Sequence, residues 1–130
     1  MKYLLDTNAV IALLKGNAAL LAKVHQHLLR DFSISAVAAH ELFFGAYRSK
    51  RVVANLARLD AMQFEVLEFD KEDARQSGEI RATLAAVGTP IGPYDILIAG
   101  QARARSLILI TRNGGEFSRV PGLHIEDWEA

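Results

Sequence analysis

Cysteine is absent from the sequence, which excludes disulfide bonds and thiolate metal sites. No stretch approaches the roughly twenty consecutive apolar residues that span a membrane. The N-terminus does not resemble a signal peptide either, because Asp6 and Asn8 interrupt its first apolar run. These absences predict a cytoplasmic protein with no membrane partner.

Net charge is absent too, since 15 Lys and Arg residues cancel 15 Asp and Glu residues. Only a local basic patch could therefore indicate a nucleic-acid partner. Hydrophobic residues make up 51% of the chain and charged residues 23%, which is typical of globular proteins and not of disordered ones. Because the 130 residues contain no repeat or linker, we expect one domain spanning residues 1–130.

Apolar strands alternate with helices along the whole chain. We expect strands at 2–5, 32–35, 64–69, 106–110 and 124–125, and helices at 9–14, 18–29, 36–47, 52–61, 71–87 and 94–104. Asn8 is the expected N-cap of the first helix and Ser35 that of the third. The strand at 64–69 is expected near the sheet edge. The order of elements predicts an α/β sandwich with a mainly parallel sheet.

Four acidic positions stand out in this framework. Asp6 directly follows the first strand, at the point where α/β folds bind ligands, although an acid there also suits the positive end of the next helix. Glu41 lies among apolar and small helical neighbours, so it either pairs with an arginine or faces a polar site. Asp95 occupies the first turn of an otherwise apolar helix, and Asn113 and Glu116 follow the apolar strand at 106–110.

Carboxylates that converge without matching cations repel one another, and a divalent metal among them relieves that repulsion. Oxygen ligands alone, with no cysteine and no histidine pair, favour Mg²⁺ or Mn²⁺. The chemistry that suits such a cluster is metal-assisted hydrolysis of a phosphodiester.

Four motifs lie in order along the chain: Leu5-Asp6-Thr7-Asn8, Glu41-Leu42 followed by Gly45, Ile91-Gly92-Pro93-Tyr94-Asp95 running on to Ile98-Ala99, and Ile110-Thr111-Arg112-Asn113 with Glu116-Phe117. Together they resemble a PIN-domain ribonuclease, and more narrowly the VapC-type toxins of bacterial type II toxin–antitoxin systems. The resemblance implies a PIN-like three-layer α/β/α sandwich with a five-stranded sheet. It also implies a Mg²⁺- or Mn²⁺-dependent endoribonuclease acting on RNA, with transfer RNA among the candidate substrates.

The resemblance also implies roles for individual residues. Asp6 and Asp95 are expected as metal ligands, and Glu41 as a ligand or as the base that acts on the attacking water. A fourth acid of the family corresponds to Asn113, with Glu116 just beyond, so both are expected around the ligands rather than among them. The hydroxyls of Thr7 and Thr111 are expected to orient carboxylates or a metal-bound water.

Partners follow from the same resemblance. Basic residues near the site are expected to hold RNA phosphates, namely Arg48, Lys50, Arg51 and Arg112. The family implies a homodimer and a VapB-type antitoxin whose tail crosses the catalytic groove. The aromatic residues Phe43, Phe44 and Tyr47 could line that groove, a dimer interface or the protein core.

Two other functions remain open from the sequence. A Mg²⁺-dependent phosphatase or phosphotransfer domain also begins with a strand that ends in Asp. Such a domain needs a second acid close to Asp6 and a late lysine, where this chain has Leu5, Asn8 and Arg112. The other alternative is a catalytically silent PIN-like module that only binds RNA or protein, although all three expected acids are present.

Overall fold

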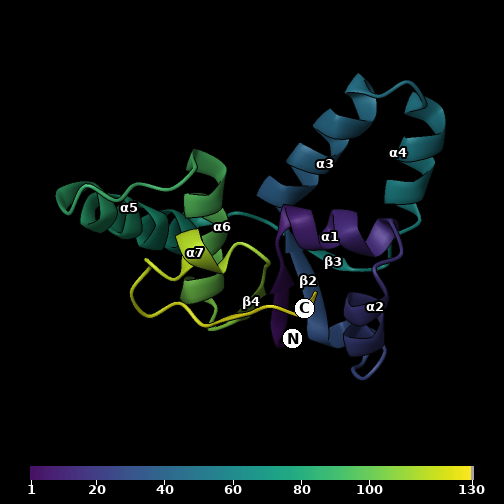
Figure 1. Cartoon of the computed structure of the whole chain (residues 1–130). Coiled ribbons are helices and arrows are strands. Elements are labelled where there is room, and N and C mark those ends of the chain that lie inside the picture. The colour runs from purple at the N-terminus through teal and green to yellow at the C-terminus, as the bar shows by residue number, and fades with distance from the viewer. Residues whose placement is uncertain (130) are drawn as a thin grey trace.

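A computed structural model describes residues 1–129 of the chain (Figure 1). The strands are β1 (Tyr3–Leu5), β2 (Phe32–Ser35), β3 (Glu65–Leu67), β4 (Ile108–Ile110) and β5 (Ile125–Glu126). The α-helices are α1 (Thr7–Leu14), α2 (Ala18–Val24), α3 (Ala36–Arg48), α4 (Val52–Asp60), α5 (Lys71–Ala86), α6 (Pro93–Ala104) and α7 (Gly114–Phe117), and one 3₁₀ turn, η1 (Leu29–Asp31), precedes β2. The predicted alternation of strands and helices is confirmed.

The five strands form one sheet in the order β3-β2-β1-β4-β5, and every pair is parallel. Leu5 at the end of the central strand β1 is in register with Ile34 of β2 and Ile110 of β4. The strand order reverses at β1, because the chain moves from β1 toward one edge and later returns to the other side. Residues beyond the ends of β1 and β4 therefore lie at the crevice where such sheets bind ligands.

Helices cover both faces of the sheet, which gives the predicted three-layer α/β/α architecture. Leu4 and Leu109 point into a core shared with α5 and α6. Their neighbours Leu5 and Ile110 point into the opposite core, shared with α1, α2 and Trp128. This alternation follows from the two-residue period of a strand, and the buried faces stabilise the position of each strand end.

The first helix begins differently from the sequence-based prediction. Asp6, and not Asn8, is the N-cap of α1: its carboxylate accepts a 2.7 Å hydrogen bond from the backbone N–H of Ala9. Asn8 lies inside the helix and is exposed. The prediction recognised that Asp6 suits the positive end of this helix but gave the cap to Asn8. Asp6 is the residue whose side chain satisfies a free N–H group of the first turn.

Two predicted helices change length or orientation. The helix expected at 18–29 ends at Val24, and Leu28 beyond it is 56% exposed. The helix expected at 71–87 ends at Ala86 and buries Asp73, Ser77, Ile80 and Leu84. Ala74 and Val87 are exposed, although both are apolar.

Helices α5 and α6 pack very closely where Ser77 meets Gly100. A methyl group placed on Gly100 would lie 1.9 Å from the Ser77 hydroxyl and 2.8 Å from the Ser77 Cα. Only glycine therefore fits at this crossing. The contact fixes α6, whose first turn carries Asp95, against the rest of the fold.

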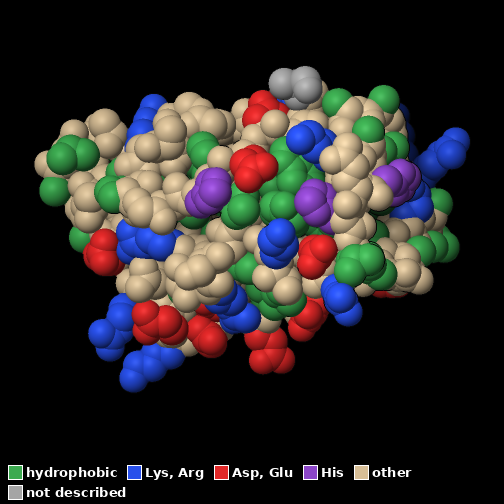
Figure 2. Space-filling model, turned by 90° about the horizontal axis from the view of Figure 1, so that it is seen from below, with side chains coloured by type: hydrophobic (Ala, Val, Ile, Leu, Met, Phe, Trp, Pro, Cys, Tyr) green, Lys and Arg blue, Asp and Glu red, His purple; other side chains and the backbone are tan. Residues whose placement is uncertain are grey.

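Lys and Arg side chains are interspersed with Asp and Glu on the face seen from below, and histidines lie among them (Figure 2). This mixture agrees with the zero net charge of the chain. A phosphate backbone is held by clustered positive charge, so this face is unlike a nucleic-acid surface. Within residues 1–129, no helix is both long enough and apolar enough to span a membrane.

Candidate active site

Asp6 is buried at the junction of β1 and α1, with only 3% of its surface exposed. Burial raises the pKa of Asp6 above its ordinary value, because the charged form loses solvation. The Thr111 hydroxyl and the Ala9 N–H oppose this shift, while the carboxylates of Glu129 and Glu41 reinforce it. Asp6 therefore sits close to other negative charges as well as capping its helix.

Glu41 reaches the same place from the middle of α3. Its Oε1 accepts a 2.7 Å hydrogen bond from the hydroxyl of Thr7, the first residue of α1. Thr7 thus orients a carboxylate, as expected for it from the sequence, and the carboxylate is Glu41. The bond joins two helices that begin at the carboxyl ends of neighbouring strands, so β1 and β2 jointly set the position of Glu41.

Asp95 enters from the first turn of α6, two residues after the proline that opens the helix. Its pKa is raised to about 6 by burial and then by the charges of Asp6, Glu116 and Glu41, in decreasing order. All of these influences disfavour the carboxylate, and none comes from a cation. The structure therefore brings the three predicted acids and Glu116 close enough to repel one another.

Thr111 and Asn113 line the end of β4 beside this cluster. Thr111 is 2% exposed, and its hydroxyl accepts a 2.9 Å hydrogen bond from the backbone N–H of Asn113. The short turn orients Thr111 toward Asp6, whose pKa it lowers. The side chain of Asn113 makes no hydrogen bond to residues 1–129, whereas Glu116 contributes charge to the cluster from α7.

The donor set of this cluster consists of carboxylate and hydroxyl oxygens, which suit hard divalent cations. Among residues 1–129, no three His, Asp or Glu side chains are already gathered at a spacing that could hold one metal ion. The acids are therefore near neighbours that share an excess of negative charge, not a finished coordination shell. A divalent cation would fit this set by offsetting the repulsion that raises the pKa of Asp95.

The four basic residues predicted to hold RNA lie on two segments. Arg48 ends α3 and Lys50 and Arg51 form the turn to α4, whereas Arg112 follows β4. All four are exposed, and none forms an ion pair with residues 1–129. Exposed positive charge is thus present at the end of α3, in the turn to α4 and directly after β4.

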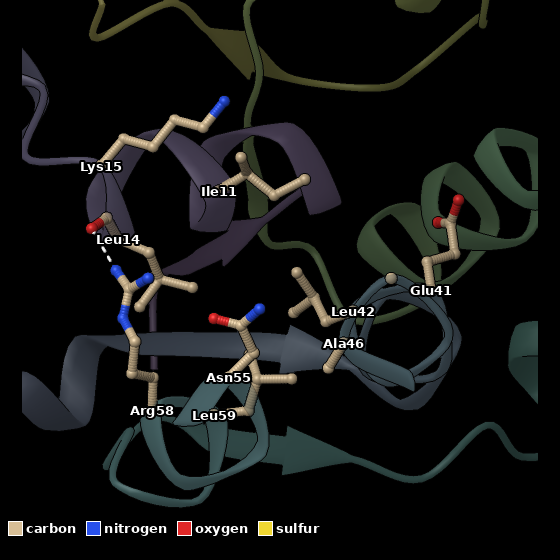
Figure 3. Close-up of a pocket in the computed structure, with 10 residues that line it drawn as sticks. Ile11, Leu14, Lys15, Glu41, Leu42, Ala46, Asn55, Arg58 and Leu59 are labelled. Atoms are coloured by element: carbon tan, nitrogen blue, oxygen red, sulfur yellow. Dashed lines mark hydrogen bonds between the residues drawn. The ribbon is translucent and has the colours of Figure 1, made fainter. Parts of the chain in front are cut away.

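An apolar groove lies between α1, α3 and α4, and Glu41 stands at one end of it (Figure 3). Its volume is about 340 Å³, and its lining includes Ile11, Leu14, Leu42, Gly45 and Leu59. Arg58 and Asn55 add polar groups from α4, and the guanidinium of Arg58 donates to the carbonyl of Leu14. The groove joins a largely apolar surface to the rim of the acidic cluster.

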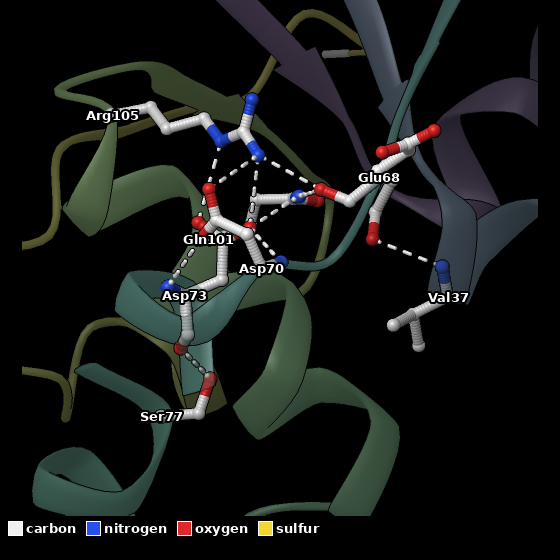
Figure 4. Close-up of polar contacts among 8 residues, drawn as sticks. Val37, Glu68, Asp70, Asp73, Ser77, Gln101 and Arg105 are labelled. Carbon is white, nitrogen blue, oxygen red and sulfur yellow. Dashed lines mark hydrogen bonds and ion pairs between the residues drawn. The ribbon is translucent and has the colours of Figure 1, made fainter. Parts of the chain in front are cut away.

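The far end of α6 is held by a buried polar network that sequence analysis did not find (Figure 4). Asp73 of α5 is 1% exposed and accepts hydrogen bonds from Gln101, at 2.9 Å, and from Arg105, at 3.0 Å. Burial would raise the pKa of Asp73, but the donors Arg105, the Asp70 N–H and Gln101 outweigh it and lower that pKa. Gln101 and Arg105 also donate to the carbonyl of Glu68, at 2.9 and 2.8 Å.

Sequence analysis also missed an aromatic contact beside the acids. His40 and Tyr94 each precede a predicted acid by one residue, and their rings meet edge to face with centroids 4.9 Å apart. Both side chains are exposed. The contact could have been predicted from the positions of His40 and Tyr94 next to Glu41 and Asp95. Two helices that present acids to one site also bring the residues beside those acids together.

Comparison with known proteins agrees with this architecture. Residues 3–123 match the PIN domain. The tRNA(fMet)-specific endonuclease VapC of Salmonella typhimurium is 40% identical over 130 residues, covering 98% of each chain. Ribonuclease VapC2 of Haemophilus influenzae strain Rd is 34% identical over 131 residues, with 98% of each chain covered. In the crystal structure of DNA-bound VapBC from Salmonella typhimurium, the matching chain has a TM-score of 0.93 at 40% identity, with 98% of each chain covered.

The fold, the sheet order and the acids at the strand ends define a PIN domain. Full-length similarity to several VapC proteins narrows this assignment. The chain belongs to the PIN-domain family and, within it, to the VapC-type ribonucleases.

Proposed function

We propose that this protein is the toxin of a type II toxin–antitoxin system, an endoribonuclease that hydrolyses RNA phosphodiesters. The observation that carries the proposal is the convergence of Asp6, Glu41 and Asp95, without a neighbouring cation, at the strand ends of a PIN domain. We also propose that residues 1–130 form a single PIN domain and that the protein acts in the cytoplasm. Family membership favours this function over a phosphatase.

Mg²⁺ or Mn²⁺ is the proposed cofactor, held by Asp6, Asp95 and Glu41. Such an ion would supply a hydroxide at neutral pH and neutralise the charge that develops on the phosphate. Glu41 either joins the ligands or takes the proton of the attacking water, and the 2.7 Å bond from Thr7 keeps its carboxylate aimed at the site. Thr111 holds Asp6 in a similar way, while Asn113 and Glu116 surround the ligands.

The RNA backbone would be held by Arg48, Lys50, Arg51 and Arg112, all of which are exposed. The relative named a tRNA(fMet)-specific endonuclease is 40% identical over nearly the whole chain. We therefore propose initiator transfer RNA as the first substrate to test.

A VapB-type antitoxin is the proposed protein partner, because the similar solved structures are VapBC complexes. The apolar groove between α1, α3 and α4 suits an apolar antitoxin segment, and the acids at its end suit a basic side chain of the same segment. We also propose that the toxin forms a homodimer.

The decisive test is RNA cleavage by purified, antitoxin-free protein. Total RNA and initiator transfer RNA are incubated with Mg²⁺ or Mn²⁺, with EDTA, and with an Asp6→Asn variant. Asn caps a helix about as well as Asp, so Asp6→Asn preserves the start of α1 while removing a proposed ligand. Discrete fragments that disappear with EDTA and with Asp6→Asn are expected.

Absence of any cleavage by wild-type protein would instead support the silent binding module. Mn²⁺ titration calorimetry on Glu41→Gln separates the two roles of that residue. Weakened metal binding would identify a ligand, whereas lost cleavage with unchanged metal binding would identify a base. If neither property changed, Glu41 would have no role in the reaction.

A further inference from the structure

Exposed rings gather on α3 and at the start of α6, immediately beside the acidic cluster. Phe44 is 59% exposed and Tyr94 is 47% exposed. His40 and Phe44 are four residues apart on α3 and so lie on one face of that helix, and His40 contacts Tyr94 across the gap to α6. Rings in such positions contribute little to the core, because much of their surface remains in water.

A cation accompanies this face. The Arg48 guanidinium lies over the Phe44 ring, 5.1 Å from its centroid, and Arg48 is a further four residues along the same helix. Arg48 forms no ion pair with residues 1–129, so its charge stays available to an incoming anion. We call His40, Phe44, Arg48 and Tyr94 the aromatic rim.

The orientation of His40 is fixed by a hydrogen bond. Its Nδ1 lies 3.0 Å from the carbonyl oxygen of Val37, and that oxygen can only accept, so Nδ1 carries the proton. The ring is thus held against Tyr94 instead of rotating freely in solvent. Restricting a ring before a ligand arrives lowers the ordering cost of binding it.

The acidic cluster itself repels the phosphates that it must hydrolyse. Affinity for RNA must therefore come from groups beside the acids. These groups either carry positive charge or bind the bases through contacts that do not depend on charge. Base stacking on rings is insensitive to the sign of the nearby charge, and arginine adds attraction for both phosphates and bases. The aromatic rim supplies both kinds of contact, and its members His40 and Tyr94 directly precede Glu41 and Asp95.

We propose, on the basis of the ribonuclease function above, that the aromatic rim is a stacking site for unpaired bases flanking the scissile phosphodiester. His40 with Tyr94 forms one platform, and Phe44 with Arg48 forms the other. Single-stranded RNA fits this surface better than a protein helix does, because His40 and Tyr94 carry polar groups and Arg48 lies over Phe44, so the face is not continuously apolar. Bases held on the His40–Tyr94 platform would bring the RNA backbone close to Glu41 and Asp95, the sequence neighbours of these two rings.

The test measures RNA binding in the Asp6→Asn background, where cleavage is removed. A short labelled single-stranded RNA of mixed sequence is titrated by fluorescence anisotropy, alongside a series of oligonucleotides that each carry one abasic position. Tyr94→Leu and Phe44→Leu remove a ring, whereas Tyr94→Phe and Phe44→Tyr keep one as matched controls. Circular dichroism verifies that each variant is folded.

Stacking contributes roughly 1–3 kcal/mol per base, so each Leu variant should bind the intact RNA about 5- to 150-fold more weakly. The ring-keeping variants should bind within about threefold of the parent protein. The loss caused by Tyr94→Leu should disappear when the RNA lacks the base that stacks there. Equal losses at every abasic position, or no loss at all, would overturn the proposal.

Two further outcomes separate this inference from the proposed function. If wild-type protein cleaves RNA while the Leu variants bind RNA normally, and also cleave it normally when made in the wild-type background, the stacking site is refuted and the ribonuclease is not. If the Leu variants lose capture of the VapB-type antitoxin but keep RNA affinity, the aromatic rim is a protein interface and the inference is likewise refuted. If the wild-type protein cut no RNA, the ribonuclease proposal would be refuted, whatever the Leu variants showed.

Discussion

Replacing Asp95 by Asn should stabilise the metal-free protein at pH 8. The pKa of Asp95 is raised from 3.8 to about 6, so the folded state disfavours the carboxylate relative to the unfolded chain. At a pH above both values Asp95 is ionised in both states, and its charge costs stability in the folded one. Asn keeps the shape of the side chain and removes that charge.

The size of the effect follows from the shift. A change from 3.8 to about 6 corresponds to at most about 3 kcal/mol, at about 1.4 kcal/mol per pH unit. Asp95 is only partly buried, so solvent screening reduces this figure. Losing a negative charge from the first turn of α6 subtracts roughly another 0.5 kcal/mol. We expect Asp95→Asn to raise the free energy of unfolding by about 1–2 kcal/mol at pH 8.

The pH dependence has a definite sign. Because the folded pKa is the higher one, the folded state takes up the proton first as the pH falls. The cost of ionised Asp95 is therefore full above pH 6 and is relieved between pH 6 and pH 3.8. The advantage of the Asn variant should be present at pH 8 and nearly gone at pH 4.

Urea unfolding followed by circular dichroism at pH 8, 6 and 4, with chelator present, measures these differences. Glu68→Gln is the matched control, because Glu68 is exposed and its carboxylate makes no hydrogen bond or ion pair with residues 1–129. Saturating Mg²⁺ should reverse the order of stability, since only the wild type keeps the full ligand set. If Asp95→Asn were no more stable than wild type at pH 8, or if its stability advantage were as large at pH 4 as at pH 8, repulsion could not be the cause.

Other parts of the fold allow equally direct tests. Gly45→Phe should fold normally but lose antitoxin capture in co-purification, because a Cβ at Gly45 meets no atom within 4 Å and the ring beyond it would occupy the groove that Gly45 lines. Gly78→Phe, where a Cβ is equally unobstructed on α5, should keep antitoxin capture. Gly100→Ala should lower the urea midpoint sharply, and adding Ser77→Ala should not restore it because the Ser77 backbone clashes as well. Asp73→Asn should lower the free energy of unfolding at pH 7 by about 3–5 kcal/mol, since three donors lose a charged acceptor. The wild-type contribution should fade below pH 3.8, because the folded pKa lies under that value. Light scattering should give twice the 14.3 kDa mass of one chain if the homodimer forms.

Prediction from the sequence succeeded where a pattern of residues is compatible with only one kind of structure. The strands β1 and β4 are short apolar runs followed directly by a polar residue, so both their existence and the crevice beyond them could be predicted. Ser35 caps α3 as predicted, because its side chain has a single plausible role there. The three acids come together because Asp6 follows β1, Glu41 lies on the helix that follows β2, and Asp95 lies in the first turn of α6.

Prediction failed where a residue has two roles or an unusual partner. Asp6 caps α1 and belongs to the acidic cluster, whereas the prediction gave the cap to Asn8, two residues further along the chain. Helix α5 buries Asp73 and Ser77, which no hydropathy pattern places inside. Their burial depends on Arg105 and Gly100, which lie far away in the chain, and such pairing is set by tertiary packing.

The contrast between the two ends of α6 supports a functional reading of the acids. At its C-terminal end, Asp73 and Asp70 meet Arg105, and the pKa of the buried acid is lowered. At its N-terminal end, Asp95 meets only other acids, and its pKa is raised to about 6. The residue that ends α6 thus places an arginine against a buried acid, whereas no cation among residues 1–129 shifts the pKa of Asp95. The close packing at Gly100 and the hydrogen bonds of Arg105 hold α6 in place, so Asp95 stays beside the other acids despite their repulsion. This arrangement is expected when a cation from solution completes the site.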